Sequence, residues 1–176
     1  MVGVGRAVIA DPYWANKASE GLFDEIRYCI ACTGCIDVLF VGNPVRCTVN
    51  PFAGREAESD IRPADKKKKV VVIGGGPAGL QVASIASARG HEVTLLEKHT
   101  MLGGQVRAAA IPPDKYLMAG IIRTLEVEAV KNGAVIRLGE EATPEVIREL
   151  NPDSVVVATG ARPVIPDFAR NDLNNV

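Results

Sequence analysis

The stretch that most constrains the fold is a β-branched run ending in three glycines, Val70-Val71-Val72-Ile73-Gly74-Gly75-Gly76-Pro77-Ala78-Gly79-Leu80. It predicts a strand, a tight turn and the start of a helix. Gly74 allows a sharp turn off the strand, Gly76 lets a pyrophosphate approach the backbone, and Gly79 lets the helix pack closely on the strand. Pro77 suits the first position of that helix. The sequence therefore predicts a phosphate-binding turn at a helix N-terminus.

A second strand gives this turn its context. We expect a strand at residues 92–96, which ends at Glu97, 18 residues after Gly79. A carboxylate at the tip of the second strand can accept hydrogen bonds from an adenosine ribose. The alternative is a glycine-rich turn that binds no ligand. The order strand, turn, helix, strand favours dinucleotide binding.

The remainder of the chain continues the same alternation. Apolar residues at helical spacing predict a helix from about Lys115 to Lys131, and these residues are more typical of a core than of a cofactor site. We expect strands at 135–138 and 154–159 and a helix at 144–150. The continuous apolar run after Ser154 predicts a strand buried on both faces. The fold class is therefore α/β, a doubly wound parallel sheet with ligands at the carboxyl ends of its strands, next to Gly160.

All four cysteines lie in one stretch. Cys29, Cys32 and Cys35 fall within seven residues, and Cys47 follows after eleven more. Clustered thiols in a chain without a secretion signal are typical of metal ligands. Four thiolates around a compact centre suit a cubane iron–sulfur cluster. Zinc is the alternative, although structural zinc sites usually combine two close pairs, and free or disulfide-bonded cysteines are the third possibility.

The N-terminal residues predict one strand and one helix. Residues 2–6 have the character of a strand end, and Asp11 can cap a helix that has Pro12 at its first position and runs to about Gly21. One such pair cannot bury a core of its own. We therefore expect it to pack on a later part of the chain or to be the last unit of a larger domain.

Composition excludes some classes of partner. The 176 residues are 47% hydrophobic and 23% charged with a net charge of -1, which is typical of globular proteins and gives no electrostatic reason to expect nucleic acid or an anionic membrane. No apolar run approaches the roughly 20 residues that span a bilayer. No signal peptide is recognisable, so we expect a cytoplasmic protein. Oligomerisation stays open.

A series of motifs carries a family resemblance. Taken in order, they are Gly5-Arg6, Ile9-Ala10-Asp11-Pro12, Cys29-Ile30-Ala31-Cys32, Phe40-Val41-Gly42, Cys47-Thr48-Val49-Asn50-Pro51, the first glycine turn, Gly103-Gly104-Gln105 and Ala158-Thr159-Gly160. With this order and spacing the chain resembles the multidomain old-yellow-enzyme-like iron–sulfur flavoenzymes, the group of 2,4-dienoyl-CoA reductase, enoate reductase and trimethylamine dehydrogenase.

The resemblance implies an organisation in three parts. Residues 1–21 would be the C-terminal remnant of an FMN-binding (β/α)₈ barrel, 22–65 the iron–sulfur segment and linker, and 66–176 an incomplete Rossmann-like domain for FAD, or ADP in the amine dehydrogenases. The rest of the barrel and an NAD(P)H domain would then belong to the same enzyme or to a separate subunit. We expect the chain to be a piece of a larger enzyme or one part of a split one, inactive alone.

The resemblance also implies the site residues. Gly5 and Arg6 would touch the FMN phosphate, although Arg6 could equally be an ordinary surface arginine. Lys115 would contact the flavin, with a plain polar loop as its alternative. The four cysteines would hold a [4Fe–4S] cluster. The remaining positions for the FAD or ADP are Gly74, Gly76, Pro77, Ala78, Gly79, Glu97, Lys98, Gly104, Gln105, Ala142, Ala158, Thr159 and Gly160.

In function, the resemblance implies electron transfer from NAD(P)H through FAD and the cluster to FMN, which would reduce an activated C=C bond of a small molecule. No catalytic residue is expected in this chain, because the general acid would lie in the barrel. Two alternatives remain: an electron-transfer module that serves a separate barrel, and amine oxidation. The two-residue gap between Cys32 and Cys35 is closer to the amine dehydrogenase spacing.

Overall fold

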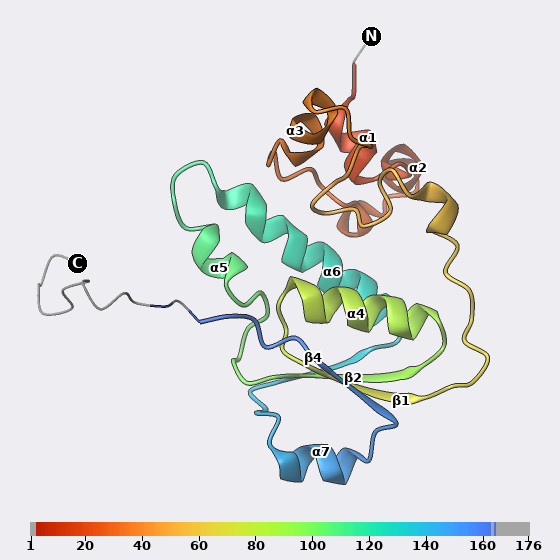
Figure 1. The fold of residues 1–176 in the computed structure, drawn as a ribbon, viewed down its shortest axis with the longest axis vertical. Coiled ribbons are helices and arrows are strands. Elements are labelled where there is room, and N and C mark those ends of the chain that lie inside the picture. Colours follow the sequence, from red (N-terminus) through yellow and green to blue (C-terminus); the bar gives the residue numbers. More distant parts are fainter. Residues whose placement is uncertain (1–2, 163, 165–176) are drawn as a thin grey trace, which may run out of the picture.

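The computed structural model describes residues 3–162 and 164. Among them, four strands form one parallel sheet in the order β3-β2-β1-β4 (Figure 1). This confirms the predicted doubly wound α/β fold. The strands are β1 (Lys69–Ile73), β2 (Glu92–Glu97), β3 (Val135–Leu138) and β4 (Ser154–Val157).

Helices lie on both faces of this sheet. Helices α4 (Pro77–Ala88) and α6 (Gly120–Lys131) cover one face, and α7 (Pro144–Leu150) lies on the other (Figure 1). The chain steps from β1 to β2 to β3 in one direction and then crosses to the opposite side of β1. Because such crossovers are right-handed, the reversal moves the next helix to the other face. It also creates a switch point between β1 and β4, where ligands bind in folds of this type.

The main core lies between the sheet and helices α4 and α6. Val72, Leu80 and Leu95 are fully buried there, and Leu125 of α6 is 3% exposed. Burying each such side chain contributes about 1.5–3 kcal/mol. Because the core residues of β1 and β2 lie directly beneath α4, they fix where the glycine turn between β1 and α4 sits.

Strand β4 differs from its prediction. Val156 packs against the main core, but Val155 and Val157 are 41% and 70% exposed. Side chains alternate between the faces of a strand, so these two point to the α7 face, and α7 leaves them uncovered. The prediction of burial on both faces is wrong for the described residues, since an apolar run does not record how many layers cover it.

The connection between β2 and β3 also departs from expectation in part. It contains a short helix α5 (Val106–Ala109), and the helix expected from Lys115 begins as a 3₁₀ turn, η3 (Tyr116–Ala119), before α6. The helix end near Lys131 agrees with the prediction.

Residues 3–65 form a separate layer of short helices. These are α1 (Arg6–Ala10), α2 (Trp14–Ser19) and α3 (Gly34–Phe40), with 3₁₀ turns η1 (Phe23–Glu25) and η2 (Glu56–Glu58). The strand expected at 2–6 is wrong where it is described, because Arg6 already opens a helix; residue 2 lies outside the described residues. The helix expected from Pro12 starts only at Trp14, because the Asp11 side chain accepts from the Tyr13 N–H and holds a turn there.

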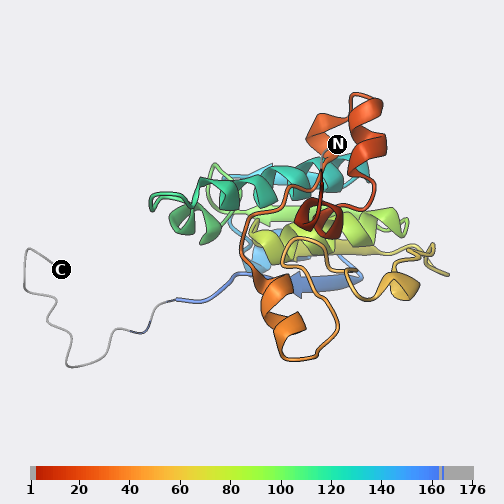
Figure 2. The same cartoon turned by 90° about the horizontal axis from the view of Figure 1, so that it is seen from above.

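This N-terminal layer packs on the outer side of α4 and α6 (Figures 1 and 2). Its small core consists of Ala10, Ile30 and Val49, with Cys29 and Cys47 at its border, and Ile121 of α6 packs against it. The cysteine segment therefore sits directly on the helix that also covers the dinucleotide-type sheet. Within the described residues, no helix is both long and apolar enough to cross a membrane.

Candidate functional site

The first glycine turn is fixed by close backbone contacts. Gly74 has a φ of +108°, which favours glycine, and a Cβ there would lie 2.5 Å from the Ala158 carbonyl oxygen. A Cβ on Gly79 would lie 1.9 Å from the Gly74 carbonyl oxygen. The Ala158 N–H donates to the Ile73 carbonyl at 2.8 Å. The ends of β1 and β4 and the start of α4 therefore meet at this turn, as the glycine spacing predicts.

Gly76 is the position at which the turn opens outward. No atom lies within 4 Å of the point where its Cβ would stand, although its φ of -79° would suit any residue. Helix α4 then begins at Pro77, without a side-chain cap on its N-terminus, and Ala78 is exposed. An uncapped helix start with open space beside a glycine suits a bound phosphate, whose charge the N–H groups and the helix dipole stabilise.

Glu97 joins the end of β2 to the glycine turn. Its side chain is buried, with one carboxylate oxygen accepting from the Gly75 N–H at 2.7 Å and the other accepting from the His99 N–H at 2.8 Å. Each carboxylate oxygen keeps a second lone pair for another donor. Glu97 thus stands where the ribose contact is expected and also braces the turn, while Lys98 beside it is exposed.

A second glycine turn lies against the first. The Gly103 N–H donates to the Gly75 carbonyl at 2.8 Å, and a Cβ on Gly104 would lie 3.5 Å from the Gly76 Cα. The Gln105 side-chain amide donates to the Ala161 carbonyl, in the segment that follows β4. Residues 103–105 therefore connect the glycine turn with the exposed Thr159 and Gly160.

Two expected contacts lie at the margins of this group. Ala142 is half-buried in the loop after β3, and that loop is held to the end of β2 by the Glu140 N–H, which donates to the Glu97 carbonyl at 3.0 Å. Lys115 is exposed at the start of η3, and no side-chain contact ties it to the glycine turns within the described residues. Its flavin contact stays a prediction.

The four cysteines line one cavity. Cys35 is buried in α3, Cys29 and Cys47 are half-buried, and Cys32 is exposed. All four are free thiols, so the structure contains no disulfide among them. Arg6 lines the same cavity, and Gly5 directly precedes it at the start of α1. The contact of these two residues with an FMN phosphate stays a prediction.

The spacing of the thiols bears on which inorganic group they fit. In the described part of the chain, no three His, Cys, Asp or Glu side chains converge closely enough to hold one metal ion. A zinc site requires all its ligands at roughly 2.0–2.3 Å from a single point. Thiolates are the ligands of iron–sulfur clusters and also of structural zinc, so the cluster at the four cysteines that line the cavity stays a prediction.

The backbone on both sides of Cys32 has an uncommon conformation. Ala31 and Thr33 both have positive φ angles, of 54° and 59°, which non-glycine residues adopt only where the surroundings hold them. Burial raises the pKa of the Cys32 thiol, but hydrogen bonds from the Thr48 side chain, 3.1 Å away, and from nearby backbone groups lower the pKa overall. A lowered pKa favours the thiolate, the form that binds metals.

Sequence reasoning missed the polar residues that hold this segment. Arg27 pairs with Glu128 of α6, and Asp11 is 2% exposed and accepts three hydrogen bonds. Arg27 stands two residues before Cys29, but a single arginine in a loop carries no pattern that would reveal a partner 101 residues away. The Asp11-Pro12 pair predicted the start of a helix but not the buried hydrogen bonds that Asp11 accepts.

The chain is similar in sequence and in fold to known proteins. Residues 68–175 match the pyridine nucleotide-disulphide oxidoreductase family. The chain is 50% identical to an NADH oxidase of Thermoanaerobacter brockii over 99% of its own length and 27% of that protein, and 44% identical to a bilirubin reductase of Mediterraneibacter gnavus over 100% and 28%. The solved structure of a 2-naphthoyl-CoA reductase in complex with 2-naphthoyl-CoA covers 92% of the chain with a TM-score of 0.88 and 41% identity.

The chain spans about a quarter of the length of these relatives. The similarity extends over the cysteine segment as well as the sheet, since it covers nearly the whole chain. The chain belongs to the pyridine nucleotide-disulphide oxidoreductase family, within the old-yellow-enzyme-like iron–sulfur flavoenzymes.

Proposed function

We propose that the protein carrying this chain is an NAD(P)H-dependent iron–sulfur flavoprotein oxidoreductase that reduces an activated C=C bond. This chain would supply the FAD site and the ligands of a [4Fe–4S] cluster. The observation that carries the proposal is the cavity lined by all four cysteines, in a segment packed directly on the helix that covers the dinucleotide-type sheet.

In this proposal, the glycine turn binds and orients the nucleotide. The backbone at Gly76 and the start of α4 would hold the pyrophosphate, and Glu97 would accept from the ribose while it braces the turn. Gln105 keeps the segment after β4 close to the second glycine turn. When bound, the flavin supplies hydride and single-electron transfer, and the cluster supplies single-electron transfer.

The cysteine segment holds its centre in a largely apolar setting. Ile9, Ile30 and Val49 line the cavity with the thiols and exclude water from one side of it. Sulfur hydrogen bonds and solvent exposure tune the potential of such clusters. Cys32, exposed and hydrogen-bonded to Thr48, is the ligand through which solvent would act.

Two relatives support reduction as the direction of the reaction. A bilirubin reductase and a 2-naphthoyl-CoA reductase are among the proteins that this chain resembles over nearly its whole length, which supports reduction of a conjugated substrate. The substrate would bind in the part of the protein outside this chain.

Amine oxidation with ADP in place of FAD is the second candidate. It is favoured by the two-residue gap between Cys32 and Cys35. The glycine turn does not separate the two nucleotides, because FAD and ADP present the same adenosine diphosphate to it.

Gly76→Ala tests the nucleotide site in isolation. The added methyl group meets no protein atom and the backbone angle is ordinary, so the fold should tolerate it. It fills the space proposed for the pyrophosphate, and we expect nucleotide affinity to fall by about tenfold or more, ~1.4 kcal/mol. The measurement is titration of the nucleotide-free whole protein with FAD and with ADP, by fluorescence.

The matched control is Gly120→Ala at the start of α6, where an added Cβ also meets nothing within 4 Å. It should bind nucleotide as the unchanged protein does. Binding of both FAD and ADP by Gly76→Ala at unchanged affinity would contradict the proposed site. If the unchanged protein binds ADP tightly and shows no measurable binding of FAD, the result would favour amine oxidation.

A further inference from the structure

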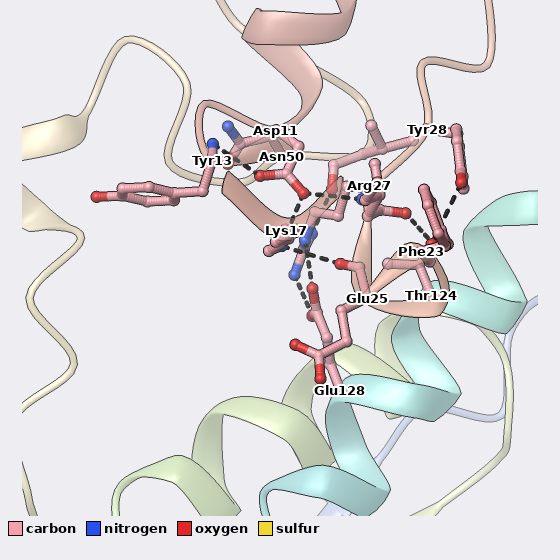
Figure 3. Close-up of polar contacts among 12 residues, drawn as sticks. Asp11, Tyr13, Lys17, Phe23, Glu25, Arg27, Tyr28, Asn50, Thr124 and Glu128 are labelled. Atoms are coloured by element: carbon pink, nitrogen blue, oxygen red, sulfur yellow. Dashed lines mark hydrogen bonds and ion pairs between the residues drawn. The ribbon is translucent and has the colours of Figure 1, made fainter. Parts of the chain in front are cut away.

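The guanidinium of Arg27 is shared by three parts of the molecule. Its Nε donates to Glu128 Oε1 at 2.7 Å, and Nη2 pairs with the other oxygen of the same carboxylate. Its Nη1 donates to the Val49 carbonyl and lies 3.4 Å from the Gln81 side-chain oxygen of α4. Figure 3 shows Arg27 and Glu128 meeting between the N-terminal layer and α6. One side chain thus contacts the cysteine loop, α4 and α6.

These contacts reach both arms of the cysteine loop, that is, the residues beside Cys29 at one end of residues 29–47 and those beside Cys47 at the other. Arg27 stands two residues before Cys29, and Val49 stands two residues after Cys47. Cys29 and Cys47 both line the cavity and border the small core that contains Val49. The guanidinium therefore fixes the separation of the two arms and, through Glu128, their position on α6.

The backbone of Arg27 is held as firmly as its side chain. Asp11, which is 2% exposed, accepts from the Arg27 N–H at 3.0 Å and from Lys17 Nζ at 2.7 Å. Lys17 also donates to the Glu25 carbonyl at 2.9 Å (Figure 3). Because Arg27 is anchored at both ends, its guanidinium is presented to Glu128 in one orientation.

Two other ion pairs of the described residues join this layer to α6, and both are more exposed. In the Lys131–Glu25 pair the lysine side chain is 58% exposed. Arg123 pairs with Asp24, but both side chains are more than 60% exposed, whereas those of Arg27 and Glu128 are 13% and 20% exposed. Exposed pairs contribute little, while a shielded two-pronged arginine–carboxylate pair gives a defined geometry.

We propose that Arg27 is a positioning residue: by joining both arms of the cysteine loop to Glu128, it sets where the cluster sits relative to the dinucleotide site, and so the rate of electron transfer between flavin and cluster. This inference rests on the proposed function. It concerns an arginine that touches neither centre and acts through Val49 and α6.

The test uses the whole protein, purified anaerobically with its iron and flavin. Arg27→Met leaves Glu128 unpaired, and Arg27→Met with Glu128→Met replaces the pair by apolar groups of similar size. Such replacements often restore stability that the single change loses. The readouts are the thermal unfolding temperature, the electron paramagnetic resonance (EPR) spectrum of the reduced cluster, and flavin-to-cluster electron transfer by stopped-flow absorbance.

We expect Arg27→Met to lower the unfolding temperature, to alter the EPR spectrum and to slow electron transfer severalfold, because the rate of electron transfer falls with the distance between the two centres. The double variant should recover the unfolding temperature without recovering the spectrum or the rate, because the Val49 carbonyl still lacks its donor. Arg27→Lys should retain only part of the unchanged protein's EPR spectrum and electron-transfer rate. The control Arg123→Met should leave all three unchanged.

Recovery of the spectrum and rate by the double variant would show that Arg27 only stabilises the fold, and would overturn the inference. So would a rate unchanged in Arg27→Met. These outcomes differ from a failure of the proposed function, in which the unchanged protein itself would contain no cluster and all variants would share that result.

Discussion

Gly79 is the residue on which the contact between α4 and β1 depends most directly. Its absent Cβ leaves room for the Gly74 carbonyl, and a methyl group there would lie 1.9 Å from that oxygen. The oxygen belongs to the backbone of the glycine turn, so it cannot move aside without moving the turn. The position therefore couples helix packing to the shape of the phosphate site.

We predict that Gly79→Ala lowers the free energy of unfolding by about 1–3 kcal/mol, the usual cost of overpacking. The matched control, Gly120→Ala, adds a methyl group to another helical glycine with open space and should raise stability by about 0.4–1 kcal/mol. Urea unfolding followed by circular dichroism measures both. Equal effects of the two substitutions would contradict the packing that we describe.

Glu97 offers a second test, of the hydrogen bonds that brace the glycine turn. Both of its oxygens accept from backbone N–H groups, and the amide nitrogen of glutamine cannot accept. Glu97→Gln should therefore leave the Gly75 or His99 N–H without its partner and cost about 1–3 kcal/mol. Glu92→Gln, at the exposed start of the same strand, should change stability by less than about 0.5 kcal/mol. An unfolding midpoint for Glu97→Gln that matches that control would show that the brace is not needed.

Among the elements, α7 has its start encoded in adjacent residues. Thr143 precedes Pro144, and its hydroxyl accepts from the Val146 N–H at 3.3 Å. We predict that Thr143→Ala costs about 1 kcal/mol, the typical value for a lost N-cap, and that Thr143→Ser retains most of the stability. Urea unfolding of the two variants separates the cap from the loss of side-chain volume, and an equal loss in both would argue against capping.

The same helix predicts a pH dependence. Hydrogen bonds from its own backbone N–H and from Arg148 and Thr143 lower the pKa of Glu145. A lowered folded-state pKa means that this stabilisation is present above the unfolded-state pKa and is lost as pH falls through the folded-state value. The urea midpoint of Glu145→Gln should therefore lie below that of the unchanged protein at pH 7 and merge with it in acid. Equal midpoints of the two proteins at pH 7 would contradict this stabilisation.

The sequence predicted the elements that neighbouring residues determine, and it did not predict those that depend on partners far along the chain. The β1 turn, the helix after it and the cap of α7 follow from Gly74, Pro77 and Thr143, whose roles are local. The exposure of Val155 and Val157 depends on which layers cover β4, and no residue of that strand records it. The fold of residues 3–65 was the least predictable part, because Asp11 and Arg27 act through partners far along the chain.

On the scale of the whole molecule, the structure has two cores of unequal size. The larger one, between the sheet and helices α4 and α6, involves none of the cysteines. The smaller one, around Ala10, Ile30 and Val49, is bordered by Cys29 and Cys47. A core this small contributes little by itself, so the cysteine segment should depend on a bound centre for much of its stability.

We therefore predict that anaerobic removal of iron by a chelator loosens residues 27–50 and leaves the sheet intact. Amide hydrogen exchange should rise in the cysteine segment, while Val72 and Leu95 in β1 and β2 stay protected. A matched sample treated with iron-saturated chelator should show neither change. Loss of protection in the sheet on the same timescale would show that the two cores unfold together.

If the four cysteines hold an iron–sulfur cluster, the anaerobically purified protein must contain iron and inorganic sulfide. We predict about four iron atoms and about four acid-labile sulfides per chain, with an EPR signal from the cluster on reduction. Cys32→Ser should lower this content, while Asp37→Ser on the exposed side of α3 should not. One zinc ion per chain with no labile sulfide would show that the cysteines bind zinc and not an iron–sulfur cluster.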